Sequence, residues 1–206
     1  MASAAHFGRL LAVLLVAAIA TLGCRHLLEG RRAIRACPGI LVPTQEIEGN
    51  FALRQRMLIR KDGTDVHLEL ALQKVGDRLL LVAFDPFGVN VFTVIQTGTE
   101  TEIEALPAAV LPVAPINVLR DVHRVRLLTA AGANSVERHG TRISEGWRAG
   151  ELEWRRFERV DGDPVGAVVV EFRPDAPADA HGAVVIQNEW CGYEAVLSTL
   201  TEEVLP

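Results

Sequence analysis

The clearest pattern in the chain is an alternation of apolar and polar side chains that begins at Phe51. Residues 66–73 carry a leucine or valine at every second position, which is typical of a strand with one buried and one solvated face. Turn residues such as Lys61-Asp62-Gly63 separate the neighbouring segments at hairpin spacing. The pattern therefore predicts an antiparallel meander of five strands, over residues 51–60, 66–73, 78–84, 89–96 and 99–105.

The pattern changes after residue 105. Residues 106–115 contain three prolines, so this stretch is excluded from a central strand. The apolar residues from Ile116 to Val125 then follow helical spacing, and Pro115 suits the first turn of a helix. Gly132 is the expected C-cap. The sequence thus predicts one amphipathic helix, residues 115–131, that covers the apolar face of the sheet.

The remainder of the chain returns to strand patterns. Residues 134–150 are polar and fit neither period. A slip of parity within residues 152–157 indicates a bulge, and residues 174–182 are rich in Ala, Asp and Pro and predict a loop. The other expected strands are 152–157, 167–172, 182–190 and 193–201. With roughly nine strands and one helix, the fold class is α+β, mainly antiparallel β, and we expect residues 51–206 to form a single domain.

The beginning of the chain has the features of a secretory signal. Residues 10–24, LLAVLLVAAIATLGC, are apolar and follow the positive charge of Arg9. This stretch is shorter than the ~20 apolar residues that a membrane-spanning helix requires. The sequence alone leaves open an ordinary cleaved signal or an uncleaved anchor.

The end of that stretch, Thr21-Leu22-Gly23-Cys24, resembles the lipobox of bacterial lipoproteins. That family prefers Leu three positions before the cysteine, where this chain has Thr21. The resemblance implies that residues 1–23 are removed and that Cys24 carries acyl chains, which hold a protein on a bilayer. It also implies that residues 24–50 form a tether and N-terminal arm. Because Arg25 replaces the Asp that retains lipoproteins at the inner membrane, the resemblance favours the outer membrane, facing the periplasm.

Composition narrows the range of partners. The chain has 206 residues, a net charge of −5 and 49% hydrophobic residues, which excludes a disordered protein. Nucleic acid is not an expected partner, because binding to its phosphates needs a basic face. With Cys24 acylated, Cys37 and Cys191 remain as a disulfide candidate in an oxidising compartment. The alternative is two free buried thiols.

Few residues point to catalysis or to metal binding. No two histidines outside the signal stand at metal-ligand spacing, and no nucleophile elbow, phosphate loop or dinucleotide fingerprint is present. We interpret Asp85 and Asp121 as caps rather than acids, and His67 and His123 as solvated residues rather than bases. We therefore expect neither an enzyme nor a cofactor. Trp147, Trp154 and Trp190 are candidates for an apolar pocket or for ordinary packing.

Two further motifs carry resemblances to known families. The corner Leu81–Gly88, followed by the strand Val91–Val94, resembles the strand–Pro-x-Gly–strand corner of the Lol carrier and receptor proteins of the Gram-negative envelope. Residues from Cys24 onward are also similar to a family of uncharacterised bacterial lipoproteins of about this length, through Ile116–Val122 and Trp190–Tyr193. Some members of that family are encoded beside aryl-polyene or fatty-acid-like synthesis genes. The Lol resemblance implies a curved sheet that forms an open half-barrel with a covering helix, and neither resemblance supplies a catalytic residue.

Two functions follow as hypotheses. The first is an envelope lipoprotein whose apolar cavity binds lipid or acyl chains, with a role in lipid or lipoprotein transfer to the outer membrane. The second is a structural or assembly lipoprotein with a filled core that acts through an envelope protein partner. A void larger than a few hundred Å³ favours the first. Strand parity selects the candidate lining residues, which in the second hypothesis form a packed core instead: Leu68, Leu70, Leu72, Val91, Ile103 and Trp154.

Overall fold

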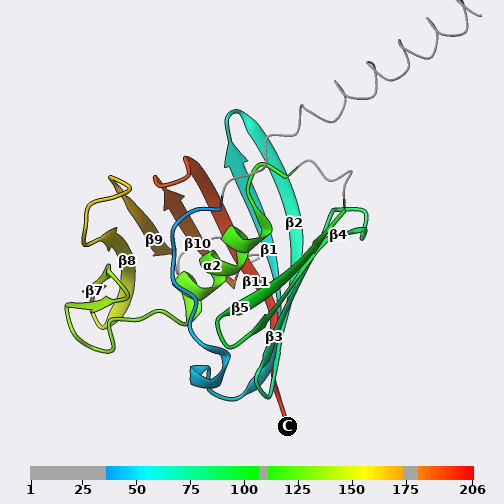
Figure 1. Ribbon diagram of the computed structural model, residues 1–206, viewed down its shortest axis with the longest axis horizontal. Helices are drawn as coiled ribbons and strands as arrows, with labels where there is room; N and C mark the ends of the chain where they lie inside the picture. Colours follow the sequence, from blue (N-terminus) through cyan, green and yellow to red (C-terminus); the bar gives the residue numbers. More distant parts are fainter. Residues whose placement is uncertain (1–35, 107–110, 174–180) are drawn as a thin grey trace, which may run out of the picture. The chain divides into compact units, whose positions relative to one another are not determined.

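The computed structural model describes residues 36–106, 111–173 and 181–206, and Cys24 lies outside these ranges. The described residues form eleven strands, one α-helix and one short 3-10 helix (Figure 1). The elements are η1 (Thr44–Glu46), β1 (Asn50–Lys61), β2 (Thr64–Val75), β3 (Arg78–Phe84), β4 (Asn90–Thr97), β5 (Glu100–Ala105), α2 (Pro115–Arg126), β6 (Ser135–Arg138), β7 (Thr141–Arg148), β8 (Glu151–Arg159), β9 (Ala167–Arg173), β10 (His181–Asn188) and β11 (Tyr193–Leu205).

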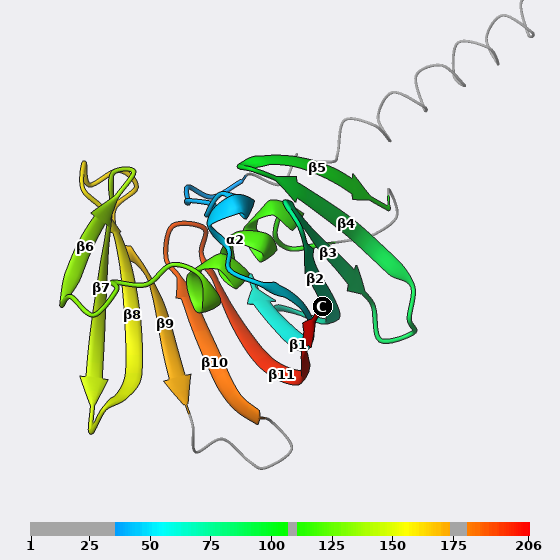
Figure 2. The same ribbon diagram turned by 90° about the horizontal axis from the view of Figure 1, so that it is seen from below.

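All eleven strands belong to one antiparallel sheet with the order β5-β4-β3-β2-β1-β11-β10-β9-β8-β7-β6. The sheet consists of two meanders, β1–β5 and β6–β11, which meet where the first strand pairs with the last. It curves strongly but β5 and β6 remain separate edges (Figure 2). The predicted fold, a mainly antiparallel open half-barrel with a covering helix, is confirmed.

Helix α2 lies against the concave face of this sheet, inside the curve (Figures 1 and 2). Pro115 occupies its first turn, as the sequence predicts, and the residues Ile116, Val118, Leu119 and Val122 are buried. They pack with inward-facing residues of the strands in one hydrophobic core. The chain leaves the sheet at β5, passes through α2 and re-enters at β6, so the helix connects the two edges of the sheet.

The helix ends five residues earlier than predicted, at Arg126 rather than residue 131, and Gly132 is not its C-cap. A side chain from the sheet satisfies the last carbonyl groups of the helix at this point. Arg155 of β8 is buried, and its guanidinium donates hydrogen bonds to the carbonyl oxygens of Arg124 (2.7 Å) and Val125 (3.1 Å). These carbonyls have no partner within the helix, and the positive charge opposes the negative end of the helix dipole.

The second meander has more strands than predicted, because residues 134–150, which the sequence left unassigned, form β6 and β7. Although the sequence of this segment is polar, one side of β7 faces inward, and its residues Thr141, Ile143 and Glu145 are all buried. Glu145 is tolerated inside because it pairs with Arg155 at 2.7 Å. The predicted bulge is present: the β7–β8 register shifts at Gly146, which leaves Glu153 as the extra residue of β8.

A disulfide between Cys37 and Cys191 ties the N-terminal arm to the turn between β10 and β11, with 5.8 Å between the two Cα atoms. The sequence had left this pairing open. The arm is part of the core, since Cys37, Val42 and Ile47 are all buried. The bond closes a loop of 154 residues in sequence and so encloses almost the whole described sheet.

We expect the double substitution Cys37→Ala/Cys191→Ala to lower the free energy of unfolding by ~2–5 kcal/mol, because the unfolded chain loses its longest constraint. Urea unfolding of the full chain, followed by tryptophan fluorescence, measures this change. A reductant should destabilise the parent to the same level and leave the double variant unchanged. Coincident unfolding midpoints for the variant and the oxidised parent would contradict the expectation.

Candidate functional site

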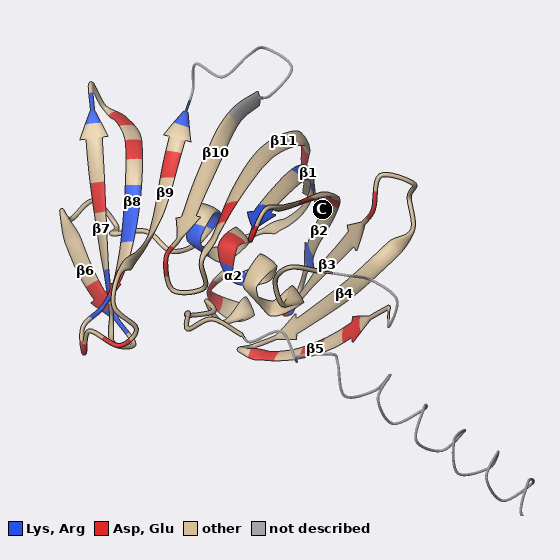
Figure 3. Ribbon diagram, turned by 90° about the horizontal axis from the view of Figure 1, so that it is seen from above, with Lys and Arg blue, Asp and Glu red and all other residues tan. Residues whose placement is uncertain are grey.

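Two charged side chains of α2, Asp121 and Arg124, are buried rather than solvated, although they lie off the apolar stripe that the sequence shows. Figure 3 shows where charged residues fall along this helix. Asp121 has no exposed surface and accepts hydrogen bonds from Arg124 (2.7 Å) and from the Tyr193 hydroxyl of β11 (2.6 Å). Burial raises the pKa of Asp121, whereas the charge of Arg124 acts in the opposite direction. Asp121 is therefore an internal ion-pair partner, and its interpretation as a cap was wrong.

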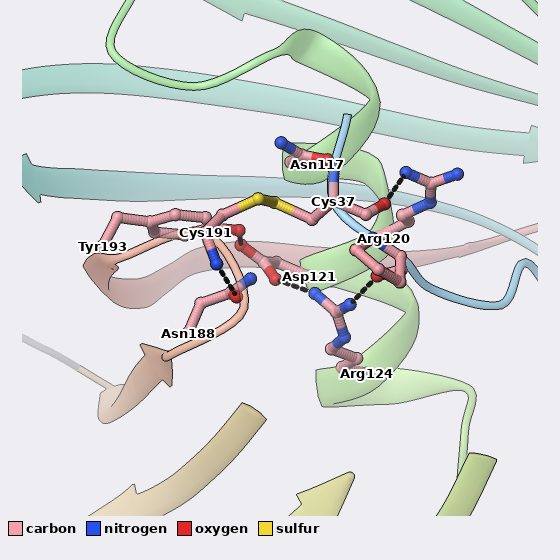
Figure 4. The surroundings of a disulfide bond; sticks show 9 residues. Cys37, Asn117, Arg120, Asp121, Arg124, Asn188, Cys191 and Tyr193 are labelled. Carbon is pink, nitrogen blue, oxygen red and sulfur yellow. Dashed lines mark hydrogen bonds and ion pairs between the residues drawn. A yellow bond between two sulfur atoms is a disulfide. The ribbon is translucent and has the colours of Figure 1, made fainter. Parts of the chain in front are cut away.

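The same helix face holds the N-terminal arm through its backbone (Figure 4). The Asn117 side-chain oxygen accepts the N–H of Cys37 at 2.8 Å, and Arg120 donates to the carbonyl oxygen of Cys37. Arg124 donates to the carbonyl oxygen of Pro38 at 2.9 Å. Three helix side chains thus bind the backbone of Cys37, which the disulfide holds, and of its neighbour Pro38.

His123 is also buried, and its imidazole contacts both the N-terminal arm and β4. Its Nδ1 accepts the N–H of Val42 at 3.0 Å, so the ring proton lies on Nε2, which donates to Gln96 Oε1 at 2.9 Å. Burial, together with the charge of Arg124, lowers the pKa of His123 from 6.5 to about 3. The imidazole is therefore neutral. Its prediction as a solvated residue was wrong, because both partners come from distant parts of the chain.

Beyond the end of α2, the concave face opens into a groove of about 780 Å³. Its floor is formed by the inner faces of β1, β9, β10 and β11, and Val125, Arg126 and Leu127 form one wall. Because the helix ends at Arg126, it leaves this end of the sheet uncovered. The groove is mainly apolar, and its apolar residues include Phe51, Val125, Leu127, Leu152, Phe172, Ala183, Val184, Leu197 and Val204.

Polar groups lie both on the floor and at the mouth of this groove. On the floor, Gln55 Nε2 lies 3.3 Å from Thr199 Oγ1, beside the bulge at which the β1–β11 register shifts. At the mouth, Arg126 of α2 forms an ion pair with Glu202 of β11. The arrangement provides a largely apolar surface with a few fixed polar groups, which is typical of small-molecule sites, whose volumes are ~300–1,000 Å³.

Residues 52–201 match the model of a protein family described as "Protein of unknown function (DUF3261)". The chain belongs to this family. No curated protein matches it in sequence. One solved structure, of a domain from Vibrio parahaemolyticus named for outer membrane lipoprotein sorting, is similar at 10% identity, with a TM-score of 0.39, over 78% of this chain and 87% of that chain.

The six residues selected for a ligand cavity do not come together in this family member. Four of them, Leu68, Leu70, Leu72 and Val91, are buried in the packed core between the sheet and α2. Ile103 lies on the edge strand β5 and is 43% exposed. Trp154 lies on the convex face, where its indole occupies the space that a Cβ on Gly146 would fill. None of the six lines the groove.

The remaining candidates from the sequence also have defined positions. Asp85 caps its own turn, because its Oδ1 accepts the N–H groups of Phe87 and Val89, both at 2.9 Å. His67 is exposed on β2, as predicted. Trp190 packs against the guanidinium of Arg124 and donates its indole N–H to Gly166. Trp147 is 55% exposed. The three tryptophans do not line a common pocket.

The described ranges contain no group of three or more His, Cys, Asp or Glu side chains that could hold a metal ion. Among these residues, no helix combines the length and the hydropathy that a membrane crossing requires.

The buried His123 predicts a stability that decreases in acid. Between the unfolded pKa of 6.5 and the folded pKa of about 3, the unfolded chain binds a proton that the native protein does not bind. The free energy of unfolding should therefore fall as the pH falls, by up to ~1.4 kcal/mol per pH unit. Urea unfolding at several pH values between about 7 and about 4.5 measures this slope, because the linkage acts in that range.

The matched control is His123→Gln, which removes the imidazole and keeps an amide at the same position. The raised pKa of Asp121 acts in the opposite sense, since the native state gains that proton first, but it does so in both proteins. The variant should therefore show a smaller loss of stability on acidification. Equal slopes in the two proteins would show that His123 does not titrate on unfolding as described.

Proposed function

We propose that this protein is an envelope lipoprotein, tethered to the outer membrane through acylated Cys24, that binds an acyl chain or lipid in the groove beyond α2. The observation that carries the proposal is the groove itself, about 780 Å³ in volume with a mainly apolar lining. Lipid or lipoprotein transfer to the outer membrane is the role that we assign to it. We propose no enzymatic activity.

The physical argument is the cost of an acyl chain in water. Each methylene that leaves water contributes ~0.8 kcal/mol. A hydrocarbon chain therefore requires a continuous apolar surface, and polar contacts serve only to orient it. The groove meets this requirement with side chains such as Phe51, Phe172 and Val184, which come from different strands and face the same space.

A second candidate function is supported by a separate observation. Under the first turns of α2 the concave face is filled by tightly packed side chains, including Leu70, Leu72 and Leu119. A structural or assembly lipoprotein that acts through an envelope protein partner needs only this filled core. The experiment below separates the two functions, because only the first requires that a hydrocarbon chain enters the groove.

We expect Val184→Trp to reduce labelling of the protein by a photoactivatable fatty alcohol in isolated envelopes by about tenfold. An indole and a ligand cannot occupy the same part of the groove, and such overpacking costs ~1–3 kcal/mol. The measurement is the yield of the cross-linked full chain, with the labelled peptide identified by mass spectrometry. Labelled peptides should come from β1, β9, β10 or β11.

The matched control is Val169→Trp, because Val169 is equally half-buried but faces the opposite side of the sheet. This variant should be labelled like the parent. Equal labelling of both variants, or labelling that maps outside the groove, would remove the acyl-binding function and favour the structural alternative.

The tether is tested separately. We expect Cys24→Ala to lose the acyl modification that mass spectrometry detects on the parent, because a methyl group has no sulfur to acylate. The variant should also keep residues 1–23, whose removal in lipoproteins accompanies acylation. If the mature parent begins elsewhere, or if Cys24 is unmodified, the protein is not a lipoprotein.

A further inference from the structure

The floor of the groove contains a polar side chain whose hydrogen-bonding capacity is not met. Gln55 is 3% exposed, and its Oε1 accepts no hydrogen bond from any described residue. Within the described part of the chain, its one side-chain bond is the 3.3 Å contact from Nε2 to Thr199 Oγ1, which is long for such a bond. A buried amide held so weakly can turn toward a ligand, and a donor that reaches Oε1 would meet its unmet capacity.

The position of Gln55 is set by an irregularity in the pairing of β1 with β11. Gln55 pairs with Thr199 next to Leu200, the extra residue of a β-bulge in β11. Bulges of this kind re-aim side chains and occur near functional sites. Here the bulge sets two polar side chains opposite each other on a floor that is otherwise apolar.

The mouth of the groove favours the same kind of ligand group. It carries the carboxylates of Glu48, Glu151 and Glu202, which only accept hydrogen bonds when ionised. Its two guanidinium groups are already engaged, since Arg126 pairs with Glu202 and Arg173 pairs with Glu171. Within the described residues, Glu48 and Glu151 have no ion-pair partner. The described lining of the groove therefore offers acceptors, and both of its guanidinium groups already have a carboxylate partner.

We infer that the ligand of this groove is an uncharged acyl compound with a hydrogen-bond donor near its head, such as an amide N–H or a hydroxyl, and that the donor binds Gln55 Oε1. This inference rests on the proposed acyl-binding function and specifies its ligand class. It disfavours fatty-acid carboxylates and phosphate head groups, which would approach Glu48 and Glu151, two carboxylates without an ion-pair partner among the described residues.

The test compares two probes that differ in one atom. N-methylpalmitamide and methyl palmitate have the same chain and shape, but only the amide has an N–H. Each competes with the photoactivatable fatty alcohol for labelling of the full chain in isolated envelopes. We expect the amide to compete at about tenfold lower concentration than the ester in the parent protein, because the ester leaves a buried acceptor without a donor.

The deciding variant is Gln55→Leu, which replaces a buried and poorly bonded amide by an aliphatic side chain of similar size. Here the ratio between the two probes should fall to about one, because the buried floor acceptor that would bind the amide N–H has been removed. Since the ratio is compared between two proteins, a difference in how the probes partition into the membrane cancels. The control is Gln73→Leu, the same change on the exposed face of β2, which should keep the parental ratio.

The outcomes distinguish the two proposals. If both probes compete equally in the parent, the donor-bearing ligand class is overturned while acyl binding stands. The same holds if Gln55→Leu leaves the ratio unchanged. If neither probe displaces the label from the groove, the acyl-binding function fails, and the ligand class fails with it. An unchanged urea midpoint for Gln55→Leu excludes unfolding as the cause of any change.

Discussion

The structure depends on the hydrogen bonds and ion pairs formed by the charged and polar side chains that helix α2 buries. Helix α2 is enclosed between the sheet and the N-terminal arm, so Asp121, His123 and Arg124 cannot reach water. An isolated buried charge is very costly, and removing one partner of a buried pair typically costs ~3–5 kcal/mol. Each of these groups therefore has a specific partner, and together the partners fix the helix against the arm, β4 and β11.

This requirement explains where the concave face is filled and where it is open. Arg155 binds the last carbonyls of the helix and is itself held by Glu145. The helix therefore spans only 12 residues, and the sheet extends beyond it. The concave face thus has two parts, a packed core beneath the helix and a groove past its end.

The sequence predicted those elements whose signal is local. The five strands of the first meander follow from alternation, and Pro115 marked the start of the helix. The sequence did not reveal β7, because a charged residue such as Glu145 is not expected on the buried face of a strand unless its partner Arg155 is known. His123 was misjudged for the same reason, since Val42 and Gln96 are remote in sequence. The groove was missed because parity cannot show where a helix stops covering a sheet.

The pairing of β1 with β11 places the first and last strands of the domain side by side in the middle of the sheet. Neither meander can bury its central edge until the final residues of the chain are available. The native topology thus has a high contact order, and closing such distant contacts slows folding. Until those final residues are synthesised, β1 lacks one of its two partner strands, and the two halves of the sheet cannot join.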